Sequence, residues 1–132
     1  MSQIKSQAVN IHQSDEKVYH FMSDFTNFEQ LIPPQVQEVK ISKDSCSFTI
    51  QGLPPVNLNI TNRTPYSMVQ MDAIDGKLPF SLKCTLEKVD DDSCIAQFVF
   101  EAELNMMMKM MVEKPLTNFL NILVEKLKEI KS

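Results

Sequence analysis

The chain has 132 residues, of which 43% are hydrophobic and 23% are charged. This length and composition are typical of one folded domain with one core, so a single domain is expected over residues 1–132. The net charge of −4 at pH 7 argues against nucleic acid as a partner, because phosphates are bound by basic surfaces. The two glycines, Gly52 and Gly76, lie far apart, which excludes a glycine-rich nucleotide-binding loop.

The cysteines and the start of the chain bear on the cellular compartment. Cys46, Cys84 and Cys94 are odd in number and form no CxxC pair, and the first residues contain no long apolar segment of the kind that directs export. These features predict a cytoplasmic location. Lys109 and Glu113 interrupt the most apolar part of the chain, so no run reaches the roughly 18 consecutive apolar residues of a membrane span. We therefore expect no stable membrane insertion.

The first predicted elements are a strand and two short helices. A β-prone segment, residues 7–11, leads into Ser14, a favourable N-cap, and a helix is predicted to begin near Asp15 because its carboxylate suits a helix N-terminus. A second short helix is predicted over residues 25–31. It should end before the proline pair at 33–34, since the residue before a proline disfavours the helical conformation.

Residues 36–104 alternate between apolar and polar side chains, with turn residues about every eight to twelve positions, which predicts six antiparallel strands. The alternation also predicts which side chains face the core. In residues 67–74 we choose the odd-numbered set, because it is the more uniformly apolar. The predicted inward positions are Val39 and Ile41; Cys46, Phe48 and Ile50; Val56, Leu58 and Ile60; Val69, Met71 and Ala73; Leu78, Phe80, Leu82, Cys84 and Leu86; and Cys94, Ala96, Phe98, Phe100, Ala102 and Leu104.

The lengths of the connections must agree with these faces, because opposed residues of a hairpin lie on the same side of the sheet. On the predicted register Cys84 opposes Phe98, and Cys94 opposes Lys88. The alternation and the register together predict a six-stranded meander with one apolar face. The connections that satisfy it are two residues at 43–44 and at 64–65, three residues at 52–54 and at 90–92, and four residues at 75–78.

The last predicted element is a long helix over residues 106–130, whose apolar residues recur at helical spacing. Pro115 interrupts it, and because Lys114 is a poor N-cap we predict a kink within one helix rather than a second start. An apolar helix stripe and an apolar sheet face bury each other, which predicts an α+β fold with this helix across the sheet. The stripe consists of Leu116, Phe119, Leu120, Leu123, Leu127 and Ile130.

Five segments carry a resemblance to a known superfamily, and together they span nearly the whole chain. They are VNI at 9–11, SDEKVYHF at 14–21, DFTNFEQL at 24–31, RTP at 63–65 and PLTNFL at 115–120. With the predicted order of strand, two short helices, six-stranded meander and long helix, the sequence resembles the START/Bet v 1-like (SRPBCC, helix-grip) superfamily, in its small polyketide-cyclase-like branch.

The resemblance implies a curved seven-stranded antiparallel sheet, with the first strand beside the last, that grips the C-terminal helix around an elongated apolar cavity. We therefore expect binding or transport of a small hydrophobic ligand, such as a lipid or polyketide-like molecule. The alternatives are a polyketide cyclase- or dehydratase-like enzyme and a co-chaperone-like protein-interaction module. Cyclases need acid/base groups inside the cavity, whereas the predicted inward set is almost wholly apolar, so binding is the preferred hypothesis.

The predicted ligand-binding residues combine inward strand positions with the facing stripe of the long helix. They are Phe48, Ile50, Leu58, Ile60, Leu82, Phe98, Phe100, Met108, Met111, Phe119 and Leu123.

The remaining chemical groups support no catalytic or metal site in the sequence. His12 and His20 are predicted to be peripheral, at a strand end and on the polar side of a short helix. The cysteines and histidines lack the paired spacing of a zinc site, and the thiols lack an adjacent base. Asp90, Asp91 and Asp92 lack the spacing of a calcium loop and indicate a turn. No catalytic residue, metal or cofactor is therefore expected.

Five of the nine methionines fall within residues 106–111. They cannot all face one side of a helix, because successive residues rotate by about 100°, so some must be exposed or lie at a cavity mouth. Flexible thioethers suit an adaptable ligand pocket or a protein-docking surface; the alternative is ordinary core filling with a few exposed side chains. We predict that this segment is a mobile lip of the cavity, loosened from the rest of the helix by Pro115.

Overall fold

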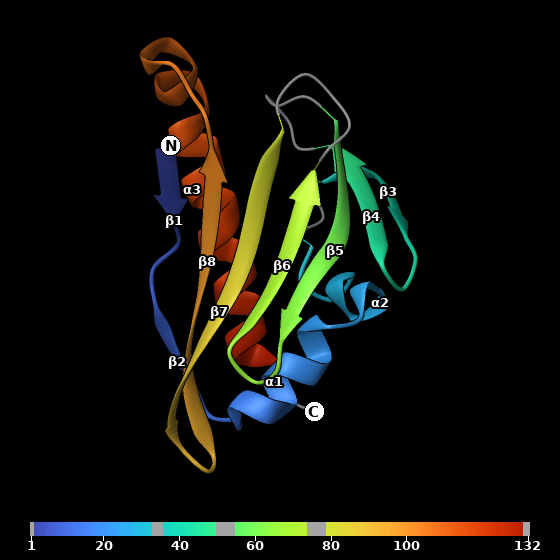
Figure 1. Cartoon of the computed structure of the whole chain (residues 1–132), viewed down its shortest axis with the longest axis vertical. Helices are drawn as coiled ribbons and strands as arrows, with labels where there is room; N and C mark the ends of the chain where they lie inside the picture. The colour runs from blue at the N-terminus through green and yellow to red at the C-terminus, as the bar shows by residue number, and fades with distance from the viewer. Residues whose placement is uncertain (1, 33–35, 50–54, 74–78, 131–132) are drawn as a thin grey trace.

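The computed structural model describes residues 2–32, 36–49, 55–73 and 79–130 (Figure 1). One hydrophobic core cluster draws side chains from the helices and from most of the strands. In chain order the elements are β1 (Ser2–Lys5), β2 (Val9–Ile11), α1 (Asp15–Met22), α2 (Phe25–Phe28), β3 (Gln37–Ile41), β4 (Ser45–Thr49), β5 (Val56–Thr64), β6 (Met68–Ala73), β7 (Phe80–Asp90), β8 (Ser93–Ala102) and α3 (Met106–Glu129).

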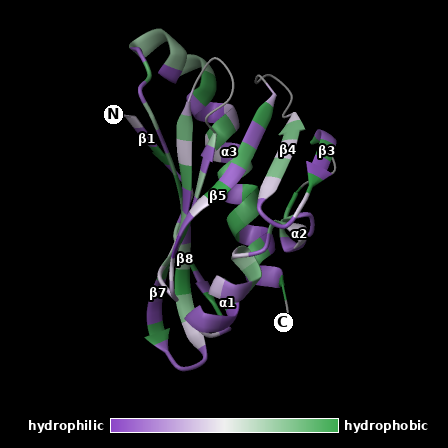
Figure 2. Cartoon of the chain, turned by 45° about the vertical axis from the view of Figure 1, so that its right-hand side comes forward, coloured by the Kyte–Doolittle hydropathy of each residue, from purple (hydrophilic) through white to green (hydrophobic). Residues whose placement is uncertain are grey.

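The strands form one antiparallel sheet in the order β1-β8-β7-β6-β5-β4-β3, and β2 pairs with β8 further along the same edge. The beginning of the chain thus lies beside the last strand. Helix α3 runs along one face of the sheet, and α1 and α2 lie at the end opposite the start of α3 (Figures 1 and 2). The α+β helix-grip architecture that the sequence predicts is confirmed.

The first strand differs from the prediction, because it is divided into β1 and β2 around Ser6. The Ser6 Oγ, rather than its carbonyl oxygen, accepts the Phe98 backbone N–H (3.0 Å), and the Ser6 N–H donates to the Phe98 carbonyl oxygen (2.9 Å). The freed Ser6 carbonyl oxygen accepts from Gln97 Nε2 (2.8 Å). Sequence analysis missed β1 because its only buried side chain is Ile4, which leaves too little alternation to detect.

The predicted inward face is confirmed for β4 to β8. Cys84 pairs with Phe98 and Lys88 with Cys94, as predicted, and the odd-numbered set of β6 is the buried one. The predicted positions Ile50 and Leu78 lie outside the described residues. Buried inward positions are Cys46, Phe48, Leu58, Val69, Met71, Ala73, Leu82, Cys84, Leu86, Cys94, Ala96, Phe98, Phe100 and Ala102; half-buried ones are Ile41, Val56, Ile60, Phe80 and Leu104.

The predicted inward position of Val39 is wrong. Ile41 pairs with Cys46 across the predicted two-residue connection, but the register shifts between Lys40 and Gln37. Glu38 lies in this bulge with φ 55°, a left-handed conformation, and Val39 is 36% exposed. An extra residue in one strand reverses the alternation beyond it, so a bulge turns Val39 away from the core.

Two other connections differ in length from the predictions, and a bulge compensates for each. Thr64 pairs with Met68, which leaves three connecting residues instead of two. A register shift between Ile60 and Asn62 restores the predicted face, although Ile60 then pairs with Met71 rather than with Val69, which a two-residue connection would place opposite it. Asp90 pairs with Ser93, which leaves two connecting residues instead of three, and a shift between Lys88 and Asp90 compensates. The predicted connections at 52–54 and 75–78 lie outside the described residues.

The two short helices are capped and tied to the sheet. Ser14 Oγ accepts the Lys17 N–H (3.2 Å) at the predicted start of α1. Helix α2 ends at Phe28 rather than at residue 31. Arg63 on β5 donates to the carbonyl oxygen of Ser23 and to Asp44 Oδ1, both at 2.8 Å, and so joins the end of α1 to the β3–β4 turn.

Helix α3 is one helix with Pro115 inside it, as predicted. Asn105 is its N-cap, with Oδ1 accepting the Met108 N–H (2.8 Å). Its buried residues begin at Phe119 and continue through Leu127, so the second half of the helix is the part anchored in the core. Among the described residues, no helix is long and apolar enough to cross a membrane.

Candidate functional site

The inner face of the sheet presents an apolar surface built from rows of cross-strand neighbours. In the central row Ile60 pairs with Met71, Met71 with Leu82, Leu82 with Phe100, and Phe100 with Ile4. This row runs from β5 to β1, because residues paired in adjacent antiparallel strands point to the same face. Side chains from five strands therefore form one continuous apolar surface beneath α3.

Aromatic contacts show how this surface meets the helix and where it extends. The ring centroids of Phe48 on β4 and Phe119 on α3 lie 5.7 Å apart, which joins the two sides of the core. The rings of Phe80 and Phe100 lie 4.8 Å apart on neighbouring strands. Both separations are within the range of favourable aromatic pairs.

One end of this interior is tightly packed. Phe25, Phe28 and Leu31 fill the end occupied by α1 and α2, and each is at most 1% exposed. Leu123 and Leu127, in the second half of α3, are at most 2% exposed. The residues of α1, α2 and the anchored part of α3 thus close this end.

The other end is less completely packed. Phe80, Leu104, Val112 and Leu116 are only partly buried although they lie against the core, and no residue of α3 before Phe119 is buried. An open, mostly polar surface hollow of about 310 Å³ lies beside Leu104 and is lined by residues 103–105 and Ser2. Burial therefore decreases along α3 toward its first turn.

The predicted ligand-binding residues occupy different places along this gradient. Ile60 and Met108 are half-buried, whereas Met111 is 71% exposed. Met108 precedes Phe119 by about three full turns and shares its face, but Met111 is rotated about 80° from Phe119. Ile50 lies outside the described residues. The fully buried members are Phe48, Leu58, Leu82, Phe98, Phe100, Phe119 and Leu123.

Four half-buried residues at the less packed end, Phe80, Leu104, Val112 and Leu116, do not belong to the predicted ligand set. Phe80 and Leu104 were predicted to face inward and Leu116 to lie on the helix stripe, but none was assigned to the ligand. Val112 received no assignment, although it precedes Leu116 by four residues and continues the same stripe by one turn. These four residues share one property that the strand and helix patterns do not express, which is that they lie far from α1 and α2, the helices that close the opposite end.

Among the residues that the structure describes, three buried thiols lie at this inner face. Burial raises the pKa of Cys46 to about 12 and that of Cys94 to about 11. Burial, with a smaller contribution from Cys94, raises the pKa of Cys84 to about 12. All three are therefore neutral thiols at pH 7, and they act as small apolar side chains.

Both histidines are exposed, as the sequence predicts. His20 Nε2 lies 4.0 Å from Glu16 Oε1 on the same helix, and the His20 ring contacts the rings of Tyr19 and Tyr66. Asp90 accepts the Asp92 N–H (2.8 Å), which is the interaction of a turn. Among the described residues no group of three His, Cys, Asp or Glu side chains is placed to hold a metal ion.

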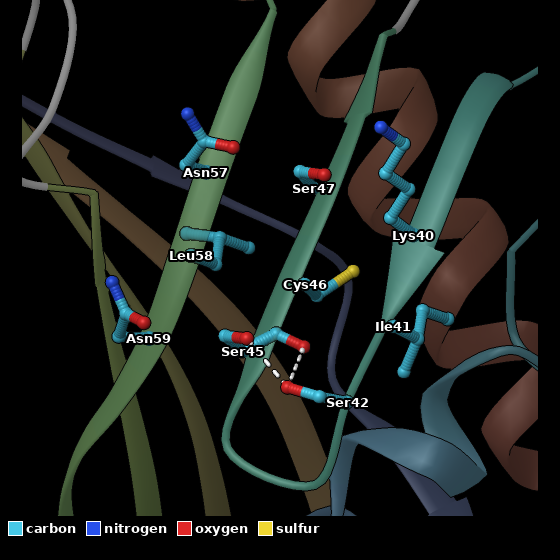
Figure 3. A pocket seen from close by; sticks show the side chains of 9 residues that line it. All are labelled: Lys40, Ile41, Ser42, Ser45, Cys46, Ser47, Asn57, Leu58 and Asn59. Carbon is cyan, nitrogen blue, oxygen red and sulfur yellow. Dashed lines mark hydrogen bonds between the residues drawn. The ribbon is translucent and has the colours of Figure 1, made fainter.

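A second hollow lies on the outer side of the sheet, over β3, β4 and β5, and has a volume of about 470 Å³ (Figure 3). Ser45 pairs with Asn59 and Ser47 with Asn57, so hydroxyl and amide side chains alternate across its floor. The hydroxyl oxygens of Ser42 and Ser45 lie 2.6 Å apart. This polar hollow is open to solvent and offers hydrogen bonds, whereas the inner surface offers apolar burial.

No protein-family model matches the sequence, and no curated protein shows a significant match. Solved structures do resemble the fold. A START superfamily protein from Mycobacterium smegmatis matches with a TM-score of 0.73 and 14% identity, over 96% of this chain and 94% of that one. The KanY protein matches with a TM-score of 0.74 and 14% identity, over 98% and 97%.

Norcoclaurine synthase from Thalictrum flavum, in complex with dopamine and hydroxybenzaldehyde, matches with a TM-score of 0.77 and 15% identity. The match covers 99% of this chain and 88% of that one. These three structures share a sheet wrapped around a long C-terminal helix with the chain described above. The chain therefore has the START/Bet v 1-like, helix-grip fold.

Proposed function

We propose that the protein binds a small hydrophobic molecule between the inner face of its sheet and helix α3. The observation that carries the proposal is the gradient of burial along α3. Phe25, Phe28 and Leu127 close one end, while Val112 and Leu116 remain half-buried at the other. A ligand held at the second end would complete the burial of apolar side chains that the protein alone leaves partly exposed.

The energetics favour an apolar occupant. Completing the burial of one half-exposed Leu or Phe side chain contributes roughly 1 kcal/mol, at about 25 cal/mol per Å² of apolar surface. Phe80, Leu104, Val112 and Leu116 together would contribute several times this amount, together with the apolar surface of the ligand itself. Such binding selects for shape and apolarity, which agrees with a carrier or storage role for a lipid or polyketide-like molecule.

The fold comparison supports this class of function without distinguishing a carrier from an enzyme. Norcoclaurine synthase holds small aromatic molecules in its solved complex, and a polyketide cyclase-like role is the enzymatic alternative. Acid/base catalysis near pH 7 needs a group that titrates near pH 7. The buried thiols of this inner face have pKa values of about 11 to 12, which is why binding is preferred to catalysis.

Binding of a fluorescent apolar probe tests the proposal. We expect 8-anilinonaphthalene-1-sulfonate to bind the folded chain at one site, and Leu116→Gln to weaken binding about five- to tenfold, because it places an amide at the ligand surface. The matched control is Val89→Gln, since Val89 is 50% exposed on β7 beside the β7–β8 turn. Equal effects of the two variants on probe affinity, with both folded by circular dichroism, would contradict the proposal.

A further inference from the structure

The first two turns of α3 expose an unusual concentration of thioethers. Met106, Met107, Met110 and Met111 are between 71% and 81% exposed, and we call these four residues the methionine patch. They lie at the end of the molecule opposite α1 (Figure 1). Large apolar side chains exposed in such density call for a role beyond packing.

Helical geometry places the four side chains of the methionine patch on one side of α3. At about 100° per residue they span an arc of about 140°. Two pairs are four residues apart and one pair is three apart, spacings that bring Cβ atoms to about 5–6 Å. Met108 and Val112 lie outside this arc, and both are half-buried. The methionine patch is thus separate from the surface proposed to hold the apolar ligand.

The backbone under the patch is held in helical form. Asn105 Oδ1 accepts the Met108 N–H, and the Asn105 carbonyl oxygen accepts the Lys109 N–H (2.9 Å). Lys109 is half-buried and lies outside this arc, and its Nζ lies 3.9 Å from Glu113 Oε2, so the Glu113 carboxylate offsets its charge. The four methionines therefore share one capped helical segment, and the cation beside them is paired.

Thioether sulfur is a soft, neutral ligand that selects soft monovalent metal ions such as Cu(I) and disfavours hard ions such as Mg²⁺ and Ca²⁺. The thiols of the chain do not compete, because Cys46, Cys84 and Cys94 are at most 2% exposed. We propose that the methionine patch is a binding site for a soft monovalent metal ion, Cu(I) or its analogue Ag(I), held by three or four thioethers.

This inference goes beyond the ligand proposal and does not depend on it. The flexible side chain of methionine has three rotatable bonds, which lets sulfur atoms on neighbouring turns converge on one ion. The positive end of the α3 dipole opposes a cation, so the affinity must come from the sulfur ligands themselves.

A property of the thioether gives the site a distinctive pH dependence. Thiolate and imidazole ligands must lose a proton to bind a metal, so their affinity falls as the pH is lowered. A thioether carries no such proton. Binding at the methionine patch should therefore be the same at pH 7 and at pH 5, within a factor of about two.

Titration of the full chain with Ag⁺ in chloride-free buffer, followed by calorimetry and native mass spectrometry, tests the proposal. We expect one Ag⁺ to bind, and the ε-methyl resonances of the four patch residues to shift. Replacing Met106, Met107, Met110 and Met111 together by Leu should weaken binding at least tenfold. Leucine keeps the apolar volume and favours a helix at least as well as methionine, so the fold should be retained.

The matched control is Met108→Leu, which removes a thioether from the same segment but from the opposite face of α3; its affinity for Ag⁺ should equal that of the wild type. Three results would each overturn the proposal: no binding of Ag⁺, equal binding by the quadruple variant, or loss of binding at pH 5. Shifts of the Cβ resonances of Cys46, Cys84 or Cys94 in the folded chain when Ag⁺ is added would assign the metal to cysteine and overturn it as well.

Discussion

The side chain of Ser6 replaces one backbone hydrogen bond between the first part of the chain and β8. Its Oγ is the acceptor for the Phe98 N–H and also donates to the Gln7 carbonyl oxygen (2.9 Å). Ser6 is 3% exposed, so this hydroxyl takes the place that a carbonyl would hold in a regular strand. The division into β1 and β2 therefore depends on one side chain.

Ser6→Ala should lower the free energy of unfolding by about 1–3 kcal/mol, because it leaves a buried backbone N–H without its acceptor. Urea unfolding followed by circular dichroism measures the change. Ser47→Ala, on the solvent side of β4, is the control and should change stability by less than about 0.5 kcal/mol. Equal stabilities of the two variants would show that the Ser6 hydroxyl is not needed to complete the ladder.

Asp72 joins three strands on the outer face of the sheet. Its carboxylate accepts from Gln70 Nε2 (3.0 Å), Ser81 Oγ (2.7 Å) and Thr61 Oγ1 (3.0 Å). Partial burial raises the pKa of Asp72, but these three hydrogen bonds outweigh it, so the pKa lies below the ordinary value of 3.8. The folded state therefore favours the ionised carboxylate.

A lowered pKa in the folded state makes stability depend on pH in a defined direction. The contribution of Asp72 is fully present above its unfolded value near 3.8 and is lost as the pH falls through the lower folded value. Asp72→Asn should therefore remove part of the loss of stability below about pH 4. Asp91→Asn is the control, since the Asp91 side chain is 95% exposed. The same acid unfolding profile for Asp72→Asn and wild type would contradict this role.

At the scale of elements, the sequence predicts faces better than connections. The inward set of β6 was chosen from its composition alone, and the structure buries Val69 and Met71. The lengths at 64–65 and 90–92 were wrong, yet the faces beyond them were right. The alternation fixes only whether the number of loop residues plus bulged residues is odd or even. A loop that is one residue longer therefore gives the same faces when a bulge adds one residue to a strand.

A related limit applies to the predicted ligand-binding residues. Alternation identifies which side chains face inward, but it does not give their position along the interior. Phe98 and Phe80 are both inward on paired strands, yet only Phe98 is fully buried. The difference arises from tertiary packing, because Phe28 and its neighbours close one end of the interior, and no local pattern records that contact.

The two halves of α3 should differ in local stability. Residues 106–113 include no buried side chain, whereas Phe119, Leu123 and Leu127 anchor the second half. Pro115 removes one helical hydrogen bond and crowds the carbonyl of residue 111, which loosens the junction. We therefore propose that the first half is the lip that admits the ligand.

Hydrogen exchange of backbone amides measures this difference. Residues 106–113 should exchange fast in the free protein and become protected when an apolar ligand is added, while residues 119–127 should exchange slowly in both states. Slow and equal exchange along the whole helix, with or without ligand, would contradict the proposal that residues 106–113 open to admit the ligand. These methionines would then be ordinary surface residues of a rigid helix.

In the whole molecule, the sheet, α1, α2 and the second half of α3 pack closely together, whereas the first half of α3 contributes no buried side chain. Arg63 ties the end of α1 to the β3–β4 turn, and Gln7 on the opposite edge donates its backbone N–H to Asn121 Oδ1 on α3 (2.8 Å). Both ties lie away from the first turn of α3. Neither of these hydrogen bonds restrains the first turn of α3, so that turn can move when a ligand binds.

A titration with an apolar ligand, such as a medium-chain fatty acid, followed by the methyl resonances of Leu, Ile and Val, locates the ligand site. We expect the largest shifts at Ile60, Leu104, Val112 and Leu116, which are half-buried against the core. We expect no comparable shift at Val89, which is exposed on β7. Shifts confined to Val89 and other exposed methyl groups, or no saturable shift at the half-buried residues, would contradict a ligand site inside the grip of the sheet.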